Sequence, residues 1–415
     1  MKTFLNYFLL LSYLCIGFLG PFGAVDRIAS QYLLLGIINM FSLFYFAWGG
    51  LNEKFILQLK TNKPFLIFVS FFLWSLISII YSINKIETFI SLVRLFVIIA
   101  TTMSIILHVS KIEKLKNLFI FIFLPVITIQ FLYPFEALLD IISKIGFFNF
   151  SMSNDLETFT PNKNITAAII ACHLPFVFIL YSYVNSKKVY LIGLVSIIIF
   201  IGVVDIIFLS ARASLLGLFG SLFFVYIICL VFKKKLSKKL HLFSLILILA
   251  AIFSNFYLGS ANSASLNKRI ASINLADESA NQRMRYYKHG ITHFSNNPLI
   301  GIGLGAWKLK SIEYDKENII QYIVPYHLHN DFIQYGTELG IIGFLLYAGI
   351  FLNILVINIK RIKINLNLSI SLIMSITILF FDSNLNFPHH RPIMMILFGF
   401  IIALTQYNKV NAIQN

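Results

Sequence analysis

Residues 326-YHLHNDFIQYGTELGIIG-343 place two histidines, an asparagine and an aspartate directly in front of an apolar run. That run continues through 344-FLLYAGIFLNILVIN-358, so the apolar part is long enough to cross a hydrocarbon core of roughly 30 Å as a helix. Ionisable side chains at the entrance to a membrane span are unusual because charge is costly there. Both the fold and the candidate chemistry are predicted from this stretch outward.

The composition of the whole chain agrees with a membrane-embedded fold. Of its 415 residues, 58% are hydrophobic and only 12% are charged, 43 are Phe, and the mean hydropathy is +0.84. These values exclude an ordinary soluble globular protein. The predicted fold class is therefore an all-α polytopic integral membrane protein.

Hydrophobic stretches of about 17 to 25 residues recur along the chain and predict about 12 transmembrane helices. The first stretch follows Lys2 and resembles a signal peptide, but it lacks a small-residue cleavage site, so a retained helix is favoured. The predicted spans are 4–20, 32–50, 64–83, 90–108, 117–137, 165–184, 189–209, 213–232, 241–258, 339–358, 367–383 and 389–406.

Lysine and arginine concentrate in alternate short loops, which are expected to be cytoplasmic. About half of the 33 basic residues lie in five such segments. The segments are LNEKFILQLKTNK, SKIEKLKN, NSKK, KKKLSKK and KRIK. The net charge of +16 is thus explained mainly by topology and contact with anionic lipid, and no pattern of nucleic-acid binding is present.

Two long connections fall on the outer side of the membrane in this topology, at about 138–164 and about 259–338. The second divides the chain into spans one to nine (1–258), a large periplasmic loop (259–338), and spans ten to twelve with a short cytoplasmic tail (339–415). A loop of this length is usually functional or disordered, and its helix-compatible spacing followed by turn residues favours order.

The glycine-rich segment GIGLG at 301–305 does not predict a nucleotide site. It has no preceding strand, no lysine at the P-loop offset and no acidic residue at the Rossmann offset. A tight turn after Asn297-Pro298 is the favoured interpretation, and a supporting role beside an anionic ligand is the alternative.

Ionisable residues near the outer ends of the spans predict a single site in the outer leaflet. A charge at the bilayer centre costs about 2.5–3.5 kcal/mol, so such residues mark sites by default. The converging residues are Arg94, Asp205, Arg212, Arg283, Arg285, His329, Asp382 and Arg391. Simpler alternatives stay open: Arg94 extends to the interface or pairs with Asp205, and Asp382 pairs with Arg391.

The other histidines do not suggest a metal centre. His108 and His173 are single histidines inside spans and are predicted to be satisfied core residues. His327 and the His389-His390 pair lack the further carboxylate or histidine ligands of a metal site. The three cysteines lie inside apolar spans and indicate neither a disulfide framework nor a thiolate site.

Sequence motifs surround the predicted site. His329-Asn330 is followed by nine residues and then by Gly340 and Gly343, a glycine pair expected to let the tenth span pack closely against a neighbour or against a ligand chain. Upstream, 209-LSARASLLGL-218 has a Ser-x-Arg at the start of a predicted span.

A further motif lies in 283-RMRYYKHGITHFSNNPLIGIGLGAW-307. Here Arg283 is followed four residues later by the aromatic Tyr287 and then by Pro-Leu-x-Gly-x-Gly. Together, the motifs resemble those of the O-antigen ligase and polymerase superfamily over about residues 155–400. Tyr287 stands where members of that family often have tryptophan.

The resemblance implies a polyprenyl-dependent glycosyltransferase (GT-C-like) architecture and transfer of a glycan from undecaprenyl pyrophosphate at the periplasmic face of a bacterial inner membrane. The residue types suit that chemistry, because arginine holds a dianionic leaving group and a base takes the proton of an acceptor hydroxyl. No carboxylate cluster suited to a metal is visible in the sequence, so metal independence and no cofactor are expected.

Residue roles follow from the same resemblance. His329 is predicted to be the catalytic base, and Arg212 and Arg283 are predicted to bind the pyrophosphate. Arg285 is the alternative to Arg283, since only Arg283 places an aromatic residue four positions later. The further predicted substrate-binding residues are Arg285, Asn330, Asp382, Arg391 and Arg94.

Several functions are compatible with this pattern. A ligase acting on lipid A-core is favoured by twelve spans, one dominant outer loop and the HLHN context. A polymerase of carrier-linked repeat units is the main alternative, and a protein O-oligosaccharyltransferase is a weaker one. A transporter would predict internal symmetry and charges at the midplane, and neither is present in the sequence.

Overall fold

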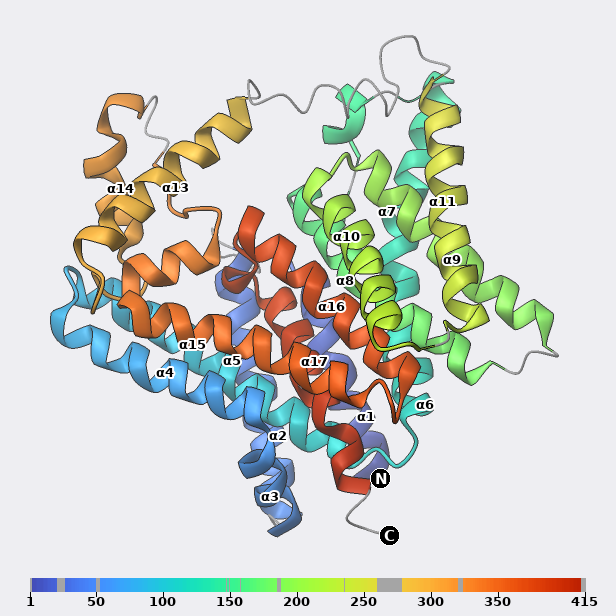
Figure 1. Cartoon of the computed structure of the whole chain (residues 1–415), viewed down its shortest axis with the longest axis horizontal. Helices are drawn as coiled ribbons and strands as arrows, with labels where there is room; N and C mark the ends of the chain where they lie inside the picture. The colour runs from blue at the N-terminus through green and yellow to red at the C-terminus, as the bar shows by residue number, and fades with distance from the viewer. Residues whose placement is uncertain are drawn as a thin grey trace. The chain divides into compact units, whose positions relative to one another are not determined.

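The computed structural model of the chain describes residues 2–20, 27–49, 53–146, 148, 150–156, 158–184, 188–234, 236–259, 278–319 and 324–411. All regular elements within these ranges are helices (Figure 1). Ten of the described helices are long and apolar enough to cross a membrane, and shorter apolar helices, Thr3–Phe18 and Pro392–Tyr407, lie where the first and twelfth spans are expected. The prediction of an all-α polytopic membrane protein is confirmed, whereas twelve spans and a GT-C-like architecture stay predictions.

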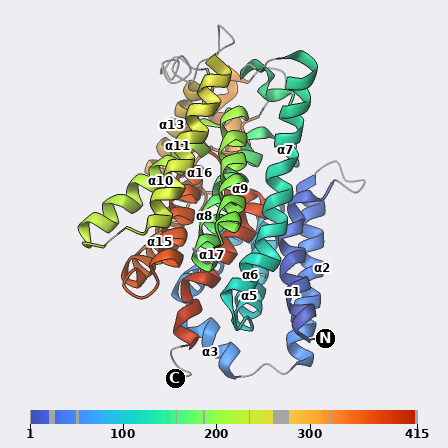
Figure 2. The same ribbon diagram turned by 90° about the vertical axis from the view of Figure 1, so that its right-hand side faces the viewer.

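The chain forms two compact units, of which the first comprises Met1–Leu19, Lys111–Asn274 and Ile357–Phe381. Helix α8 is the core of this unit, since it is buried along Thr166–Tyr181 and packs against α7, α9 and α10 (Figure 2). The described helices of the unit are α1 (Lys2–Cys15), α6 (Leu115–Leu118), α7 (Leu124–Ile145), α8 (Lys163–Tyr183), α9 (Val189–Phe208), α10 (Arg212–Val231), α11 (Lys238–Gly259) and most of α16 (Leu366–Leu385).

The second unit comprises Gly20–Ser110, Leu275–Val356 and Asp382–Asn415. Its central helix α5 packs against α2, α4 and α17. Its described helices are α2 (Arg27–Trp48), α3 (Glu53–Thr61), α4 (Lys63–Tyr81), α5 (Lys85–Ser110), α13 (Glu278–Asn296), α14 (Trp307–Asp315), most of α15 (Asp331–Arg361), the 3-10 turn η5 (Pro388–His390) and α17 (Pro392–Asn411).

The two single histidines in the spans are buried core residues, as predicted, but the Nε2 atom of His173 has no hydrogen-bond partner among the described residues. His108 Nε2 lies 3.1 Å from the Ser42 hydroxyl oxygen, where α5 packs on α2. His173 Nδ1 lies 3.0 Å from the carbonyl oxygen of Ile169 in its own helix. Both side chains are fully buried.

The glycine-rich segment 301–305 is a tight turn, as predicted, and it is wedged between the α4–α5 connection and α15. The Ile83 amide donates to the Ile302 carbonyl at 3.2 Å, and the Gly303 amide donates to the Glu338 carbonyl at 2.9 Å. A Cβ atom on Gly303, whose φ is +103°, would lie 2.4 Å from the Ser82 hydroxyl oxygen. Glycine is therefore required here both for conformation and for close approach.

The amides of this turn already bind an anion that the chain itself provides. The carboxylate of buried Glu338 accepts from the Gly305 amide at 2.8 Å and from the Trp307 amide at 3.3 Å. Because amides at a helix N-terminus favour negative charge, this carboxylate stabilises the start of α14. The turn thus joins α14 to α15, and these two amides are not open to an external phosphate.

Helix α15 begins at Asp331, eight residues before the predicted start of the tenth span, and it is broken at Gly340. Gly340 has φ 69° and ψ −168°. A Cβ atom there would lie 2.1 Å from the Leu299 carbonyl oxygen. The break is held by the Ile341 amide, which donates to the Pro298 carbonyl at 2.7 Å. The neighbour that Gly340 allows to approach is thus the turn after α13, rather than another span.

We expect Gly340→Ala to destabilise the protein strongly. Backbone strain at positive φ contributes about 1–3 kcal/mol, and overlap with Leu299 contributes about 1–3 kcal/mol more. The matched control is Gly349→Ala in the same helix, where a Cβ atom would meet only Ile67, at 3.7 Å. Thermal unfolding in detergent checks both, and equal midpoints for the two variants would contradict this role of Gly340.

Candidate active site

His329 has a left-handed backbone, with φ +56°. This conformation is uncommon for a residue other than glycine, and strained residues of this kind cluster at functional sites. The hydroxyl of Tyr287 holds the segment in place, since it lies 3.0 Å from the His329 carbonyl oxygen and 2.6 Å from the Asn384 carbonyl oxygen. The motif tyrosine on α13 thus links the histidine loop to the end of α16.

The imidazole of His329 lies between aromatic rings. It stacks on Tyr286 with ring centroids 6.3 Å apart and meets the edge of Phe387 at 5.0 Å. Its Nδ1 is buried and has no hydrogen-bond partner among the described residues. Burial lowers the pKa of His329 to about 4, and the positive charges of Arg283 and Arg391 also lower it. His329 is therefore neutral near pH 7 and able to accept a proton.

Asn330 caps helix α15. Its side-chain oxygen accepts from the Ile333 amide at 3.1 Å, and its side-chain nitrogen lies 3.3 Å from the Asn384 side-chain oxygen. A cap of this kind fixes where a helix begins. The next residue, Asp331, is buried and accepts from the His389 amide at 3.2 Å and from Tyr347 at 3.3 Å. This pair sets the position of His329 relative to the turn before α17.

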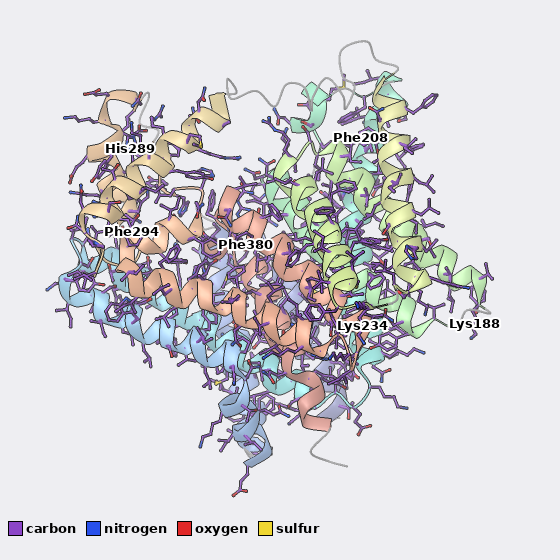
Figure 3. The ribbon with its side chains drawn as sticks, viewed as in Figure 1. Lys188, Phe208, Lys234, His289, Phe294 and Phe380 are labelled. Atoms are coloured by element: carbon purple, nitrogen blue, oxygen red, sulfur yellow. The ribbon has the colours of Figure 1, made fainter. Side chains whose placement is uncertain are left out.

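The two motif arginines on α13 have different environments. Arg285 is engaged with buried Asp315 of α14, with Nε 2.7 Å from one carboxylate oxygen and Nη2 3.2 Å from the other. His289, one turn further along α13 (Figure 3), lies 3.4 Å from the same carboxylate. Arg283 is half-buried and has no ion pair within the described ranges. Arg283 is thus the motif arginine whose charge is available to a ligand.

Arg391 and Asp382 lie in the same unit but do not form a salt bridge among the described residues. The guanidinium of Arg391 lies over the ring of Phe387 at 4.5 Å, and its Nε and Nη1 are buried without a hydrogen-bond partner there. One Asp382 oxygen accepts from Asn386 at 2.6 Å, and the other is buried and has no such partner. The two side chains therefore interact through their charges without a direct salt bridge, and no hydrogen bond joins Asp382 to His329.

Gln334 and Glu338 were not predicted as site residues. Gln334 accepts from the Leu328 amide at 3.2 Å, donates to Glu338 at 3.2 Å and lies 3.3 Å from His390 Nε2. It therefore holds the backbone just before His329. Asp331, Gln334 and Glu338 share one helical face by their spacing of three and four, which is the signal that could have found them.

Not all the predicted residues lie in the second unit. Arg94 is half-buried on α5, and its guanidinium lies 5.6 Å from the ring centroid of Tyr32. Arg212 belongs to the first unit, where it is exposed at the start of α10. Asp205 of the same unit is buried near the end of α9. The place of Arg212 in the pyrophosphate site stays a prediction from the sequence.

A metal centre would need several ligands close together. Within the described residues, no group of three or more His, Cys, Asp or Glu side chains is placed to hold a metal ion. Metal independence of the reaction stays a prediction.

The family comparison agrees with the motifs. Residues 197–348 match the family model described as O-antigen ligase. The chain carries an O-antigen ligase domain. The resemblance to the O-antigen ligase and polymerase superfamily is thereby confirmed, and members of this family are glycosyltransferase-like enzymes. No curated protein matches the chain.

The O-antigen ligase domain contains Arg212, Arg283 and His329 but ends before Asp382 and Arg391. The O-antigen ligase family in general has glycan-carrier and membrane-lipid partners. The last two residues reach the His329 site because the end of α16 and the turn before α17 fold into the second unit with it.

Proposed function

We propose that the protein is an O-antigen ligase that transfers polysaccharide from undecaprenyl pyrophosphate to lipid A-core at the periplasmic face of the bacterial inner membrane, without a metal. The observation that supports this most is His329, a neutral imidazole beside two arginines, Arg283 and Arg391, that form no direct salt bridge among the described residues. A base next to unpaired cations suits a reaction whose leaving group is an anion.

In the proposed reaction, an acceptor hydroxyl oxygen attacks the anomeric carbon of the donor glycan. The bond from that carbon to the pyrophosphate oxygen breaks, the configuration inverts, and the hydroxyl proton passes to the His329 imidazole. Arg283 and Arg391 hold the pyrophosphate and stabilise the negative charge that it gains, and the sequence motif predicts the same role for Arg212. Asp382, near Arg391 in the same unit, limits the local excess of positive charge.

Donor binding would itself activate the base. Arg283 and Arg391 lower the pKa of His329 in the unliganded protein. A bound pyrophosphate offsets these charges and adds negative charge nearby, so it raises the pKa of the imidazole. The base therefore gains proton affinity when the leaving group is in place, and activation of water without a donor is disfavoured.

This linkage predicts the pH dependence of transfer. The neutral imidazole is the active form, so kcat/KM for the donor is retained through pH 6.5 and lost as the pH falls through about 4. The acidic limb of the kcat profile should lie at higher pH than that of kcat/KM. The reason is that kcat reports the complex with bound donor, in which the pKa of His329 is raised. Arg283→Gln should shift the acidic limb of kcat/KM to higher pH, since it removes one of the charges that lower the pKa of His329. An unshifted limb near pH 6.5 in the wild type would contradict the buried, arginine-flanked base.

The function is tested on a lipopolysaccharide gel of the deletion strain, complemented with wild type and with carrier-linked glycan assayed in parallel. Unmodified lipid A-core together with accumulated long carrier-linked polymer in the deletion strain establishes the ligase. Core bearing a single repeat would instead identify a polymerase. A normal ladder in the deletion strain would overturn the proposal.

A further inference from the structure

The turn after α13, residues 298–300, lies against the apolar part of α15. The Pro298 carbonyl accepts from the Ile341 amide at 2.7 Å. Phe294, in the last turn of α13, stacks on Phe344 of α15 with ring centroids 6.2 Å apart (Figure 3). These contacts hold the turn beside α15 at the level of the break in that helix.

The break lies near one edge of the hydrocarbon core. The mostly apolar residues 341–358 follow it and cover roughly 27 Å as a helix, at about 1.5 Å per residue. That length nearly equals a hydrocarbon core of roughly 30 Å, and the basic residues Lys360 and Arg361 lie at the other end. Because the turn 298–300 is bonded to the first residue after the break, it lies at the same depth.

Helix α4 supports this depth independently. The indole N–H of Trp74 donates to the Leu339 carbonyl at 2.9 Å, so the break is level with Trp74. Beyond Trp74, α4 continues toward the glycine turn with Ile77 and Ile80, which are both exposed. Outward-facing apolar surface on α4 therefore extends past the level of the break.

The turn adds its own apolar side chains to this surface. Leu299 is 69% exposed and Ile300 is 48% exposed, and on α15 the residues Ile342 and Leu345 are exposed just after the break. Single exposed apolar residues are ordinary, whereas adjoining ones mark a contact surface. The turn and the start of the apolar part of α15 thus present one apolar surface.

We propose that the turn 298–300 inserts into the membrane leaflet on the His329 side, where Leu299 and Ile300 contact lipid acyl chains. Lipid is the occupant because this surface continues the exposed apolar residues of α4 and α15, whose length and hydropathy are those of membrane spans. The polar, exposed residues 295–297 precede the turn and suit the headgroup layer. The inserted turn anchors one end of α13 in the membrane, and Arg283 lies near the other end of that helix.

The insertion is tested by the depth of a nitroxide label on the full-length protein in vesicles of phosphatidylethanolamine and phosphatidylglycerol. Leu299→Cys is labelled in a protein whose three native cysteines are replaced by alanine. Electron paramagnetic resonance then compares collisions of the label with O₂, which concentrates in hydrocarbon, and with a water-soluble Ni(II) chelate. The controls are Leu345→Cys on α15 and Glu317→Cys, which is exposed in the turn η4 (Lys316–Asn318).

The ratio of O₂ to Ni(II) collisions at Leu299 should exceed that at Glu317 by about tenfold, because water and its solutes are excluded from hydrocarbon, and it should resemble the ratio at Leu345. Ile300→Cys should give the same result, so a folding defect in one variant does not decide the outcome. A ratio like that of Glu317 at both positions would place the turn in water and overturn the proposal.

Infrequent collisions with both reagents would also overturn it, since a partner protein or a second copy would then cover the turn. The vesicles contain neither donor nor acceptor, so contact with hydrocarbon can come only from phospholipid. Because no glycan is transferred in this measurement, the insertion can hold while the proposed function fails, and the reverse.

Discussion

His329→Asn lowers the rate of glycan transfer by about 10²–10⁴-fold, because it removes the group that takes the acceptor proton in the proposed reaction. Asparagine tolerates the left-handed backbone of this position, where φ is +56°, so the loop keeps its conformation. The amide cannot accept a proton at working pH. The measurement is kcat with purified donor and acceptor in detergent or nanodiscs, together with complementation on the lipopolysaccharide gel.

His241→Asn is the matched control, since this histidine belongs to the first unit, where its Nδ1 lies 3.2 Å from the Tyr226 hydroxyl oxygen. It should leave kcat unchanged. Thermal unfolding should show both variants folded. If His329→Asn restores the wild-type ladder at matched expression, His329 is not the base and the proposed reaction is wrong.

Arg283→Ala should lower the rate of transfer, whereas Arg285→Ala should lower the stability of the protein. Loss of Arg283 removes one cation from the developing pyrophosphate charge, and we expect kcat to fall by about 10²–10³-fold with little change in stability. Loss of Arg285 leaves the buried carboxylate of Asp315 without its bidentate partner. Its cost falls on folding instead, at roughly 1.5–3 kcal/mol.

The comparison is made by pairing transfer kinetics with thermal unfolding for both variants at matched expression. Arg285→Ala together with Asp315→Ala is the informative control, because removing both partners should recover part of the stability that Arg285→Ala loses. The prediction would be contradicted if Arg285→Ala were inactive but fully stable while Arg283→Ala stayed active. The roles of the two arginines would then be exchanged.

Several features of the site follow from its sequence alone. The helix over RMRYYKHGITHF is read from local spacing, and α13 confirms it. The tight turn at GIGLG is read from glycine content and from the absence of nucleotide motifs, and its positive φ angles confirm it. Such features depend on neighbours in the chain, which is why one sequence suffices to predict them.

Other features were beyond local reasoning. Whether Arg285 forms an ion pair depends on Asp315, which is 30 residues away in the chain. Asp315 approaches Arg285 only when α14 packs beside α13. The break at Gly340 depends on the carbonyl of Leu299 in the preceding loop. Likewise, the amides of the glycine turn are satisfied by Glu338 from the following helix, so their availability to phosphate was not a property of the GIGLG segment.

The sequence by itself determined the membrane class, the helical fold and the motifs of the O-antigen ligase domain, because hydropathy, charge and motif spacing are properties of short segments. Only the tertiary structure decided which arginines among the described residues form a salt bridge and why His329 is neutral. These depend on burial and on charges from distant segments, and both arise only when α5, α13, α15 and the turn before α17 fold together.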